Sequence, residues 1–162
     1  MSSTQAGNVT MAEGYWLTTI GTKNVIEGAA PMVLEALDRM QLDPATPFCF
    51  SDIGCADGGS SLTLVRDCIT NSRKRSPGQQ VNEVYTDQPR NNYNALFAIL
   101  HGLAERPAPS YLEDFDDVFA SAARISFYRQ MVPNNTLDLG FSSTAMNWRN
   151  SKNKDTQTGA GS

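Results

Sequence analysis

The sequence predicts an α/β protein built on a parallel sheet. Two apolar strand patterns, over 48–54 and 81–87, are each followed by a helical pattern, over 60–72 and 91–105. Strands that alternate with helices are typical of parallel sheets, and a glycine-rich turn, "GCADGG", leads from the first strand into its helix. We therefore expect the start of a doubly wound sheet with flanking helices. It is an incomplete sheet, because no strand pattern follows residue 143.

Residue spacing supports each element in turn. A helix is predicted over 31–40, because apolar residues recur there at helical spacing and Pro31 is tolerated in a first turn. Its apolar stripe comprises Met32, Val33, Ala36, Leu37 and Met40. In the helix over 60–72, the same spacing turns Leu62, Val65 and Ile69 inward. The pattern "NNYN" over 91–94 indicates helix-start capping at the next helix.

The C-terminal part of the pattern is less regular. Residues 111–127 fit either a short strand or pieces of an acidic loop. A short helix is predicted over 126–133, ended by Pro133. The alternation over 136–143 predicts the last strand.

Length and composition favour one domain with polar ends. The 162 residues include 40% hydrophobic side chains, enough for one core. We expect a domain over 11–148, between a flexible N-terminus over 1–10 and a disordered tail over 149–162. No run is long and apolar enough to span a membrane, and residues 1–13 lack the apolar stretch of a signal peptide.

Charge and cysteine usage exclude several function classes. The net charge of −4 argues against a nucleic-acid partner, and the basic cluster over 72–78 is interpreted as a solvated loop. The three cysteines and single histidine have no metal-ligand spacing, so we expect reduced thiols in a cytoplasmic protein and no metal site.

Two strands of the predicted sheet end in an acid. Asp52 lies in "SDIGCADGG" and Asp87 in "YTDQP". The carboxyl ends of parallel strands are where open α/β sheets bind ligands. An acid that closes the second strand can accept hydrogen bonds from both hydroxyls of a ribose, so the pair predicts binding of a nucleoside-type cofactor.

The cofactor class stays open at this point between three interpretations. A dinucleotide is disfavoured because the G-x-G-x-x-G spacing is absent. S-adenosylmethionine is favoured, because Asp52 lies within the first strand, where it could meet a charged amino group. The third interpretation is a glycine-rich strand–helix turn that binds nothing.

Four segments, in order along the chain, resemble the SABATH family of methyltransferases. They are "MAEGYWLTTIGTKNVIEGA" over 11–29, the glycine turn, "VYTDQPRNNYNALF" over 84–97, and "ISFYRQMVPNNTLDLGFSSTAMNW" over 125–148. The family shows D-L-G-C-S-S-G-x-N-T, N-D-L-P-x-N-D-F-N-x-L-F, S-F-Y-x-R-L-F-P and H-S-S-Y-S-L-x-W. The resemblance implies a Rossmann-like class I methyltransferase fold and transfer of methyl from S-adenosyl-L-methionine to a carboxylate or ring nitrogen of a small molecule.

The resemblance also implies roles for individual residues. Asp52 would hold the amino group of the cofactor and Asp87 its ribose. The other positions that match cofactor contacts are Tyr15, Thr19, Cys55, Ser60, Gln88, Ser126 and Phe127. Ser60 replaces the family's Asn, and Gln88 replaces its Leu.

The acceptor side departs further from the family pattern. Trp148 matches the Trp that contacts the acceptor's carboxylate, but Thr22 and Thr144 replace the family's Gln and Tyr. Trp148 could equally cap the last strand. Lys23 could pair with an acid substrate, although an exposed helix lysine is the simpler interpretation.

No catalytic residue is expected. An acceptor carboxylic acid is already ionised at neutral pH, so the reaction requires no general base. Family members are about twice this length, and the resemblance therefore indicates a shortened, N-terminal form. The alternative is a catalytically inactive cofactor-binding module that forms a homodimer or pairs with a full-length relative through the open edge of its last strand.

Overall fold

The structure is a computed structural model, which describes residues 20–126, 128–143 and 145. In this part of the chain four parallel strands form one sheet in the order β3-β2-β1-β4. The strands are β1 Phe48–Ile53, β2 Val81–Asp87, β3 Val118–Arg124 and β4 Leu139–Phe141. The predicted α/β fold class is confirmed.

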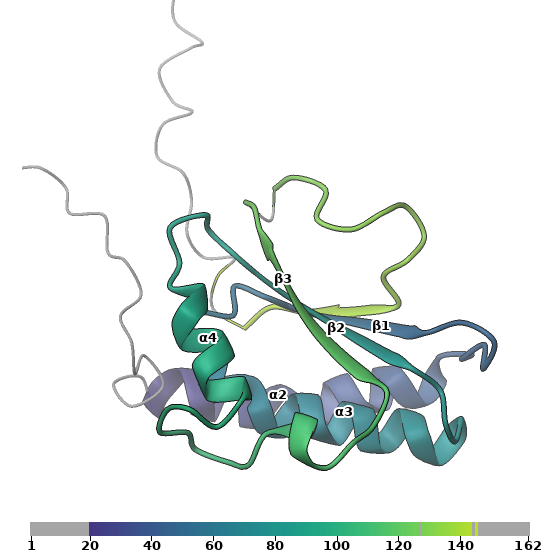
Figure 1. Ribbon diagram of the computed structural model, residues 1–162. Helices are drawn as coiled ribbons and strands as arrows, with labels where there is room; N and C mark the ends of the chain where they lie inside the picture. The colour runs from purple at the N-terminus through teal and green to yellow at the C-terminus, as the bar shows by residue number, and fades with distance from the viewer. Residues whose placement is uncertain (1–19, 127, 144, 146–162) are drawn as a thin grey trace, which may run out of the picture.

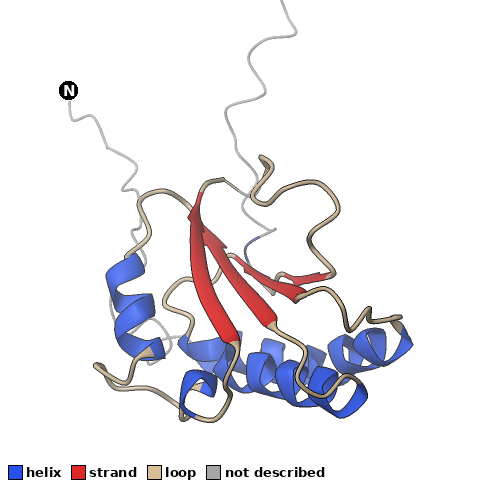
Figure 2. Cartoon of the chain, turned by 45° about the vertical axis from the view of Figure 1, so that its right-hand side comes forward, coloured by secondary structure: helices blue, strands red, loops and turns tan. Residues whose placement is uncertain are grey.

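The three described helices lie on one face of this sheet (Figure 1). They are α2 Ile20–Arg39, α3 Leu62–Arg75 and α4 Tyr93–Leu100. The chain steps from β1 to β2 to β3 in one direction, and right-handed crossovers therefore place α3 and α4 on the same side. The return step from β3 to β4 runs the other way, so the described residues between these strands, 125–126 and 128–138, cross the opposite face (Figure 2).

The core fills the space between the helices and the sheet. From β1 and α3, Phe48, Phe50, Leu62, Val65 and Ile69 are all at most 1% exposed. The predicted inward face of α3 is therefore correct. On the opposite face the 125–138 segment covers the middle of the sheet, where Ser51 Oγ lies 3.9 Å from Met131 Sδ.

The first helix is longer than its sequence predicted. α2 begins at Ile20 and continues through Pro31, so the prediction of a start at Pro31 is wrong. A proline within a helix removes one backbone hydrogen bond, and Pro31 is on the exposed side of α2, where water can satisfy the freed carbonyl. The face that packs on the core comprises Ile26, Ala30, Val33, Leu34 and Leu37. Met32, expected inside, is 70% exposed.

The later elements are shorter than expected. The helix predicted over 91–105 is limited to Tyr93–Leu100, with Asn92 as its N-cap, as the "NNYN" pattern indicated. The ambiguous 111–127 segment divides into a 3₁₀ turn, η2 Tyr111–Glu113, and strand β3. The helix predicted over 126–133 is wrong: the described residues there form turns, and the one backbone–backbone hydrogen bond among them runs from Arg129 N–H to Ser126 O at 2.9 Å.

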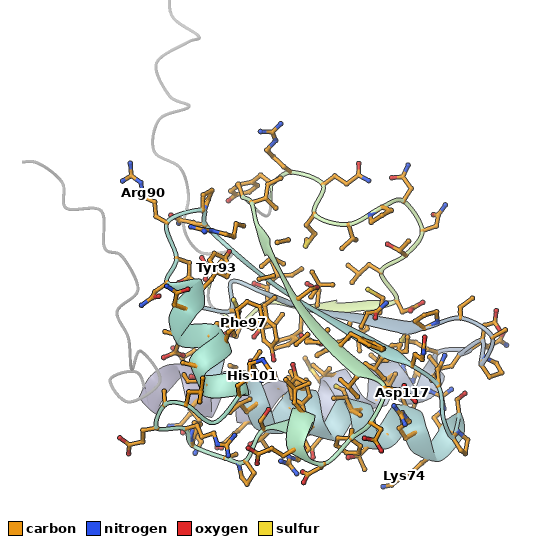
Figure 3. All side chains as sticks on the ribbon, in the orientation of Figure 1. Lys74, Arg90, Tyr93, Phe97, His101 and Asp117 are labelled. Atoms are coloured by element: carbon orange, nitrogen blue, oxygen red, sulfur yellow. The ribbon has the colours of Figure 1, made fainter. Side chains whose placement is uncertain are left out.

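The basic cluster is not a solvated loop. Residues 73–75 form the last turn of α3, and two of their arginines bind backbone carbonyls of other elements. Arg75 donates to the carbonyls of Leu37 and Met40 at the C-terminal end of α2, and Arg73 donates to that of Asp116. Lys74 is exposed and extends away from the body (Figure 3). None of the helices in the described part of the chain is long and apolar enough to cross a membrane.

Candidate functional site

The glycine turn adopts backbone conformations that only small or flexible residues accept readily. Gly54 has φ +85° and Gly58 has φ +70°, and both values lie in the left-handed region. A Cβ at Gly58 would lie 2.5 Å from Leu96 Cδ1, and one at Gly54 would lie 2.1 Å from Ala145 Cβ. The two glycines therefore let β1, α4 and the chain after β4 approach one another at one point. This point is the topological switch between β1 and β4, where open parallel sheets bind ligands.

Asp87 ends β2 and binds the turn directly. Its Oδ2 accepts the backbone N–H of Ala56 at 2.8 Å, and its Oδ1 accepts that of Gln88 at 2.6 Å. The hydroxyl of Tyr93 lies 3.0 Å from the Asp87 backbone N and 2.7 Å from its O. A carboxylate offers about four acceptor positions, so each Asp87 oxygen retains capacity for one ligand hydroxyl.

Asp52 lies beside the turn, on the helix-facing side of β1, and is 4% exposed. Ser61 Oγ donates to its Oδ2 over 2.6 Å. Burial raises the pKa of Asp52 to about 7, the hydrogen bond from Ser61 lowers it, and the charge of Asp87 raises it again. Asp52 is therefore a buried acid near the midpoint of its titration at neutral pH.

Glu83 is a third buried acid that the sequence analysis did not single out. It lies on the same face of the sheet as Asp52, because Phe50 pairs with Glu83 and Asp52 pairs with Tyr85. It is 0% exposed, and neither carboxylate oxygen has a hydrogen-bond partner in the described part of the chain. Burial, and then the charge of Asp52, raise its pKa well above the ordinary value; the Asp52 backbone N–H, which does not meet hydrogen-bond geometry, lowers it only in part. Burial therefore favours the protonated form of Glu83 in the fold. In the sequence, a glutamate between the valines of a predicted strand is the signal that could have identified Glu83.

The structure describes four of the other residues predicted to contact the cofactor. Cys55 is 7% exposed, and its backbone N–H donates to Thr86 O at 3.1 Å. Burial raises the pKa of its thiol, which fits packing better than nucleophilic chemistry. Ser60 Oγ is buried in the turn without a hydrogen-bond partner among the described residues. Gln88 is exposed at the mouth of β2, and Ser126 follows β3 at the same end of the sheet.

The acceptor residues are only partly described. Thr22 lies in the first turn of α2, half-buried. Lys23, beside it, forms an i,i+4 ion pair with Glu27 at 3.6 Å, which agrees with a surface helix lysine. The remaining predicted residues, Tyr15, Thr19, Phe127, Thr144 and Trp148, lie outside the described residues.

Arg124 is a further residue at this end of the sheet that the sequence analysis missed. It ends β3 opposite Asp87 in the register, and its guanidinium lies 5.2 Å from the ring centre of Tyr93. It also donates to Pro89 O at 2.9 Å. Arg124 thus connects the loops after β2 and β3, while Arg90 projects away from the molecule (Figure 3).

These observations define a class of protein. A parallel sheet in the order β3-β2-β1-β4 carries a glycine turn after β1 and acids at the ends of β1 and β2. This is the arrangement of an α/β nucleoside-binding domain. The family model described as "SAM dependent carboxyl methyltransferase" matches residues 11–160. The chain belongs to this family, and the SABATH resemblance is confirmed.

Individual relatives are identical to the chain at about a quarter of the aligned positions. Gibberellic acid methyltransferase 2 of Arabidopsis thaliana is 25% identical over 126 residues, which cover 73% of this chain and 31% of the relative. S-adenosyl-L-methionine:benzoic acid/salicylic acid carboxyl methyltransferase 3 of Petunia hybrida is 27% identical over 141 residues, 83% of this chain and 39% of the relative. The chain thus spans well under half the length of these relatives.

A solved structure confirms the fold. The structure described as loganic acid methyltransferase with SAH superposes with a TM-score of 0.64 at 20% identity. The match covers 89% of this chain and 40% of that one. The sheet and its helices therefore correspond to a part of a methyltransferase fold.

Proposed function

We propose that this chain provides the S-adenosyl-L-methionine-binding part of a cytoplasmic methyltransferase. Its acceptor would be the carboxylate, or the ring nitrogen, of a small molecule. One observation carries the proposal: Asp52 and Asp87 lie on adjacent parallel strands on either side of the glycine turn, at the switch point of the sheet.

The groups present fit this cofactor. The cofactor's ammonium group needs a buried anion, and Asp52 supplies a carboxylate whose Oδ1 accepts no hydrogen bond from a described residue. Its ribose needs acceptors for two hydroxyls, which Asp87 retains. Ser60 Oγ, buried without a partner among the described residues, can bond a polar group of the ligand. Cys55, Gln88 and Ser126, with Tyr15, Thr19 and Phe127, would complete the pocket.

The chain's own contribution to the reaction is to bind and orient. The bound cofactor supplies a methyl group on a sulfonium, and an acceptor carboxylate is ionised at neutral pH, so no residue has to remove a proton. Orientation and exclusion of water then account for the rate enhancement. We propose Thr22, Thr144 and Trp148 as acceptor contacts.

A second candidate is a binding module without turnover. β4 is the outer strand of the described sheet and is only three residues long. Its outer backbone groups offer an edge to another strand, either of a second copy or of a longer relative. The two candidates differ in turnover and not in cofactor binding.

Calorimetric titration with S-adenosylhomocysteine tests the cofactor site. Asp87→Asn removes one anionic acceptor from the ribose site and should weaken binding about ten- to a hundredfold. Asp116→Asn is the matched control, because Asp116 is exposed and precedes β3 at the other end of the sheet. Binding of NADH in preference to S-adenosylhomocysteine, or equal affinity in both variants, would refute the proposal.

Transfer of labelled methyl from S-adenosylmethionine to small acids then separates the two candidates. Product formation supports the enzyme. Binding without product, together with a concentration-dependent mass in sedimentation, supports the module.

A further inference from the structure

Ser61 makes a hydrogen bond that its position in the fold does not predict. It is the N-cap residue of α3, where a serine side chain ordinarily accepts a backbone N–H of the first turn, but it makes no such bond. Its hydroxyl lies 2.6 Å from Asp52 Oδ2 and, less closely, 3.1 Å from Gly58 O. Ser61 is 2% exposed. The Ser61 side chain therefore binds the acid of β1 and does not cap the helix.

The Ser61 hydroxyl differs chemically from the titratable groups around Asp52. The titratable groups that interact with Asp52 are Asp87, Glu83 and Tyr85 of β2, Cys55 of the glycine turn and Tyr111 of η2. All of them are acids, phenols or a thiol, and no basic side chain of the described residues offsets the charge of Asp52. Among the described residues, the Ser61 hydrogen bond favours the charged form of Asp52, and the positive end of the α3 helix dipole adds to it.

We propose that Ser61 is a positioning residue of the cofactor site. Its hydroxyl keeps the Asp52 carboxylate charged and holds Oδ2, so that Oδ1 is presented to the cofactor's ammonium group. Ser61 thereby sets the pH range in which the cofactor binds. This inference rests on the proposed function, since it takes Asp52 as the partner of the ammonium group.

The expected pH dependence follows from the titration of Asp52. Affinity for an ammonium group follows the charged fraction of the acid, so cofactor affinity should fall as the pH decreases through about 7, the pKa of Asp52. Below that midpoint the fall approaches tenfold per pH unit. Loss of a hydrogen bond to a charged group shifts the pKa of that group by about one to two units. Ser61→Ala should therefore raise the midpoint of the affinity profile by that amount.

The experiment compares the wild-type chain with four variants by calorimetric titration with S-adenosylhomocysteine between pH 6 and pH 9. Ser61→Ala should move the midpoint upward, and Ser61→Thr, which retains a hydroxyl, should restore it. Ser61→Cys has a weaker donor and should lie between, which keeps the test available should the alanine variant fail to fold. Ser72→Ala is the matched control, because Ser72 is a fully buried serine of α3 that bonds Ile69 O at 2.9 Å instead.

Urea unfolding without ligand gives a second readout. In both proteins the free energy of unfolding should fall as the pH rises and level off near the pKa of Asp52 in the fold. In Ser61→Ala it should level off at a higher pH, because Asp52 stays protonated to a higher pH in the fold. Unchanged midpoints in both measurements would overturn the inference. If the wild type binds no S-adenosylhomocysteine at any pH, the proposed function fails, whereas the unfolding profiles still decide whether Ser61 controls the charge of Asp52.

Discussion

Asp52→Asn should stabilise the fold at neutral pH while weakening the cofactor site. Burial raises the pKa of Asp52 from 3.8 to about 7. Between these values the folded chain holds a proton that the unfolded chain has lost, so stability falls as the pH rises. Three pH units at 1.36 kcal/mol each correspond to a loss of about 4 kcal/mol by pH 8. Asparagine keeps the shape of the side chain and cannot ionise, so the variant does not incur this loss.

Urea unfolding followed by circular dichroism at pH 4, 5, 6, 7 and 8 measures this effect. The difference in unfolding free energy between Asp52→Asn and wild type should be small at pH 4, grow by about 1.4 kcal/mol per unit above it, and level off above pH 7. In S-adenosylhomocysteine titrations at pH 8 the variant should bind more weakly, because the anion is gone. A stability difference that is constant over the whole pH range would refute the reasoning.

Two further substitutions test other parts of the same region. Glu83→Gln should gain stability relative to wild type as the pH rises above 4.5, because burial raises the pKa of Glu83 in the fold well above its ordinary value and the unfolded chain therefore ionises first; a difference that does not vary with pH in the same urea series would contradict this. Gly58→Ala should lose about 2 to 4 kcal/mol through its positive φ and its contact with Leu96. Gly78→Ala, with φ +78° and nothing within 4 Å of its Cβ, should lose only about 1 kcal/mol in thermal unfolding. An equal loss in both glycine variants would show that the contact with Leu96 is unimportant.

The sequence predicts the strands better than the helix boundaries. β1 and β2 are buried on both faces; β1 begins with a short apolar run, β2 carries valines and a tyrosine, and turn residues end both, which defines them locally. α2 could not be bounded in the same way, because Pro31 ordinarily indicates a first turn. The stripe Ile26, Ala30, Val33, Leu37 crosses the proline at helical spacing, and following that spacing would have found the longer helix. The turns over 126–133 depend on packing across the sheet, which no local pattern specifies.

The residues of the site also differ in how far the sequence could predict them. Asp52 and Asp87 could be predicted because acids at the ends of apolar strands are rare and topology brings strand ends together. Ser61 could not, because a serine two residues after "GG" at a helix start reads as an ordinary N-cap. Its bond to Asp52 depends on the three-dimensional path of the glycine turn. Arg124 was missed for a related reason: its neighbours Tyr93 and Pro89 come from the loop and helix after a different strand.

The buried acids at the ligand end of the sheet lower the stability of the fold when no ligand is bound. Burial raises the pKa of both Asp52 and Glu83; the charge of Asp87 adds to the shift at Asp52, and the charge of Asp52 adds to the shift at Glu83, so both acids lower stability as the pH rises toward neutrality. Acids with perturbed pKa values cluster at functional sites. A cationic ligand group beside Asp52 would offset the repulsion and would also favour the folded chain, since a ligand that binds only the native state stabilises it. The loss of stability and the affinity for a cation then have the same origin, the buried charge of Asp52. Substitutions at Asp52 and Ser61 should therefore change stability and binding together. Glu83→Gln should change stability alone.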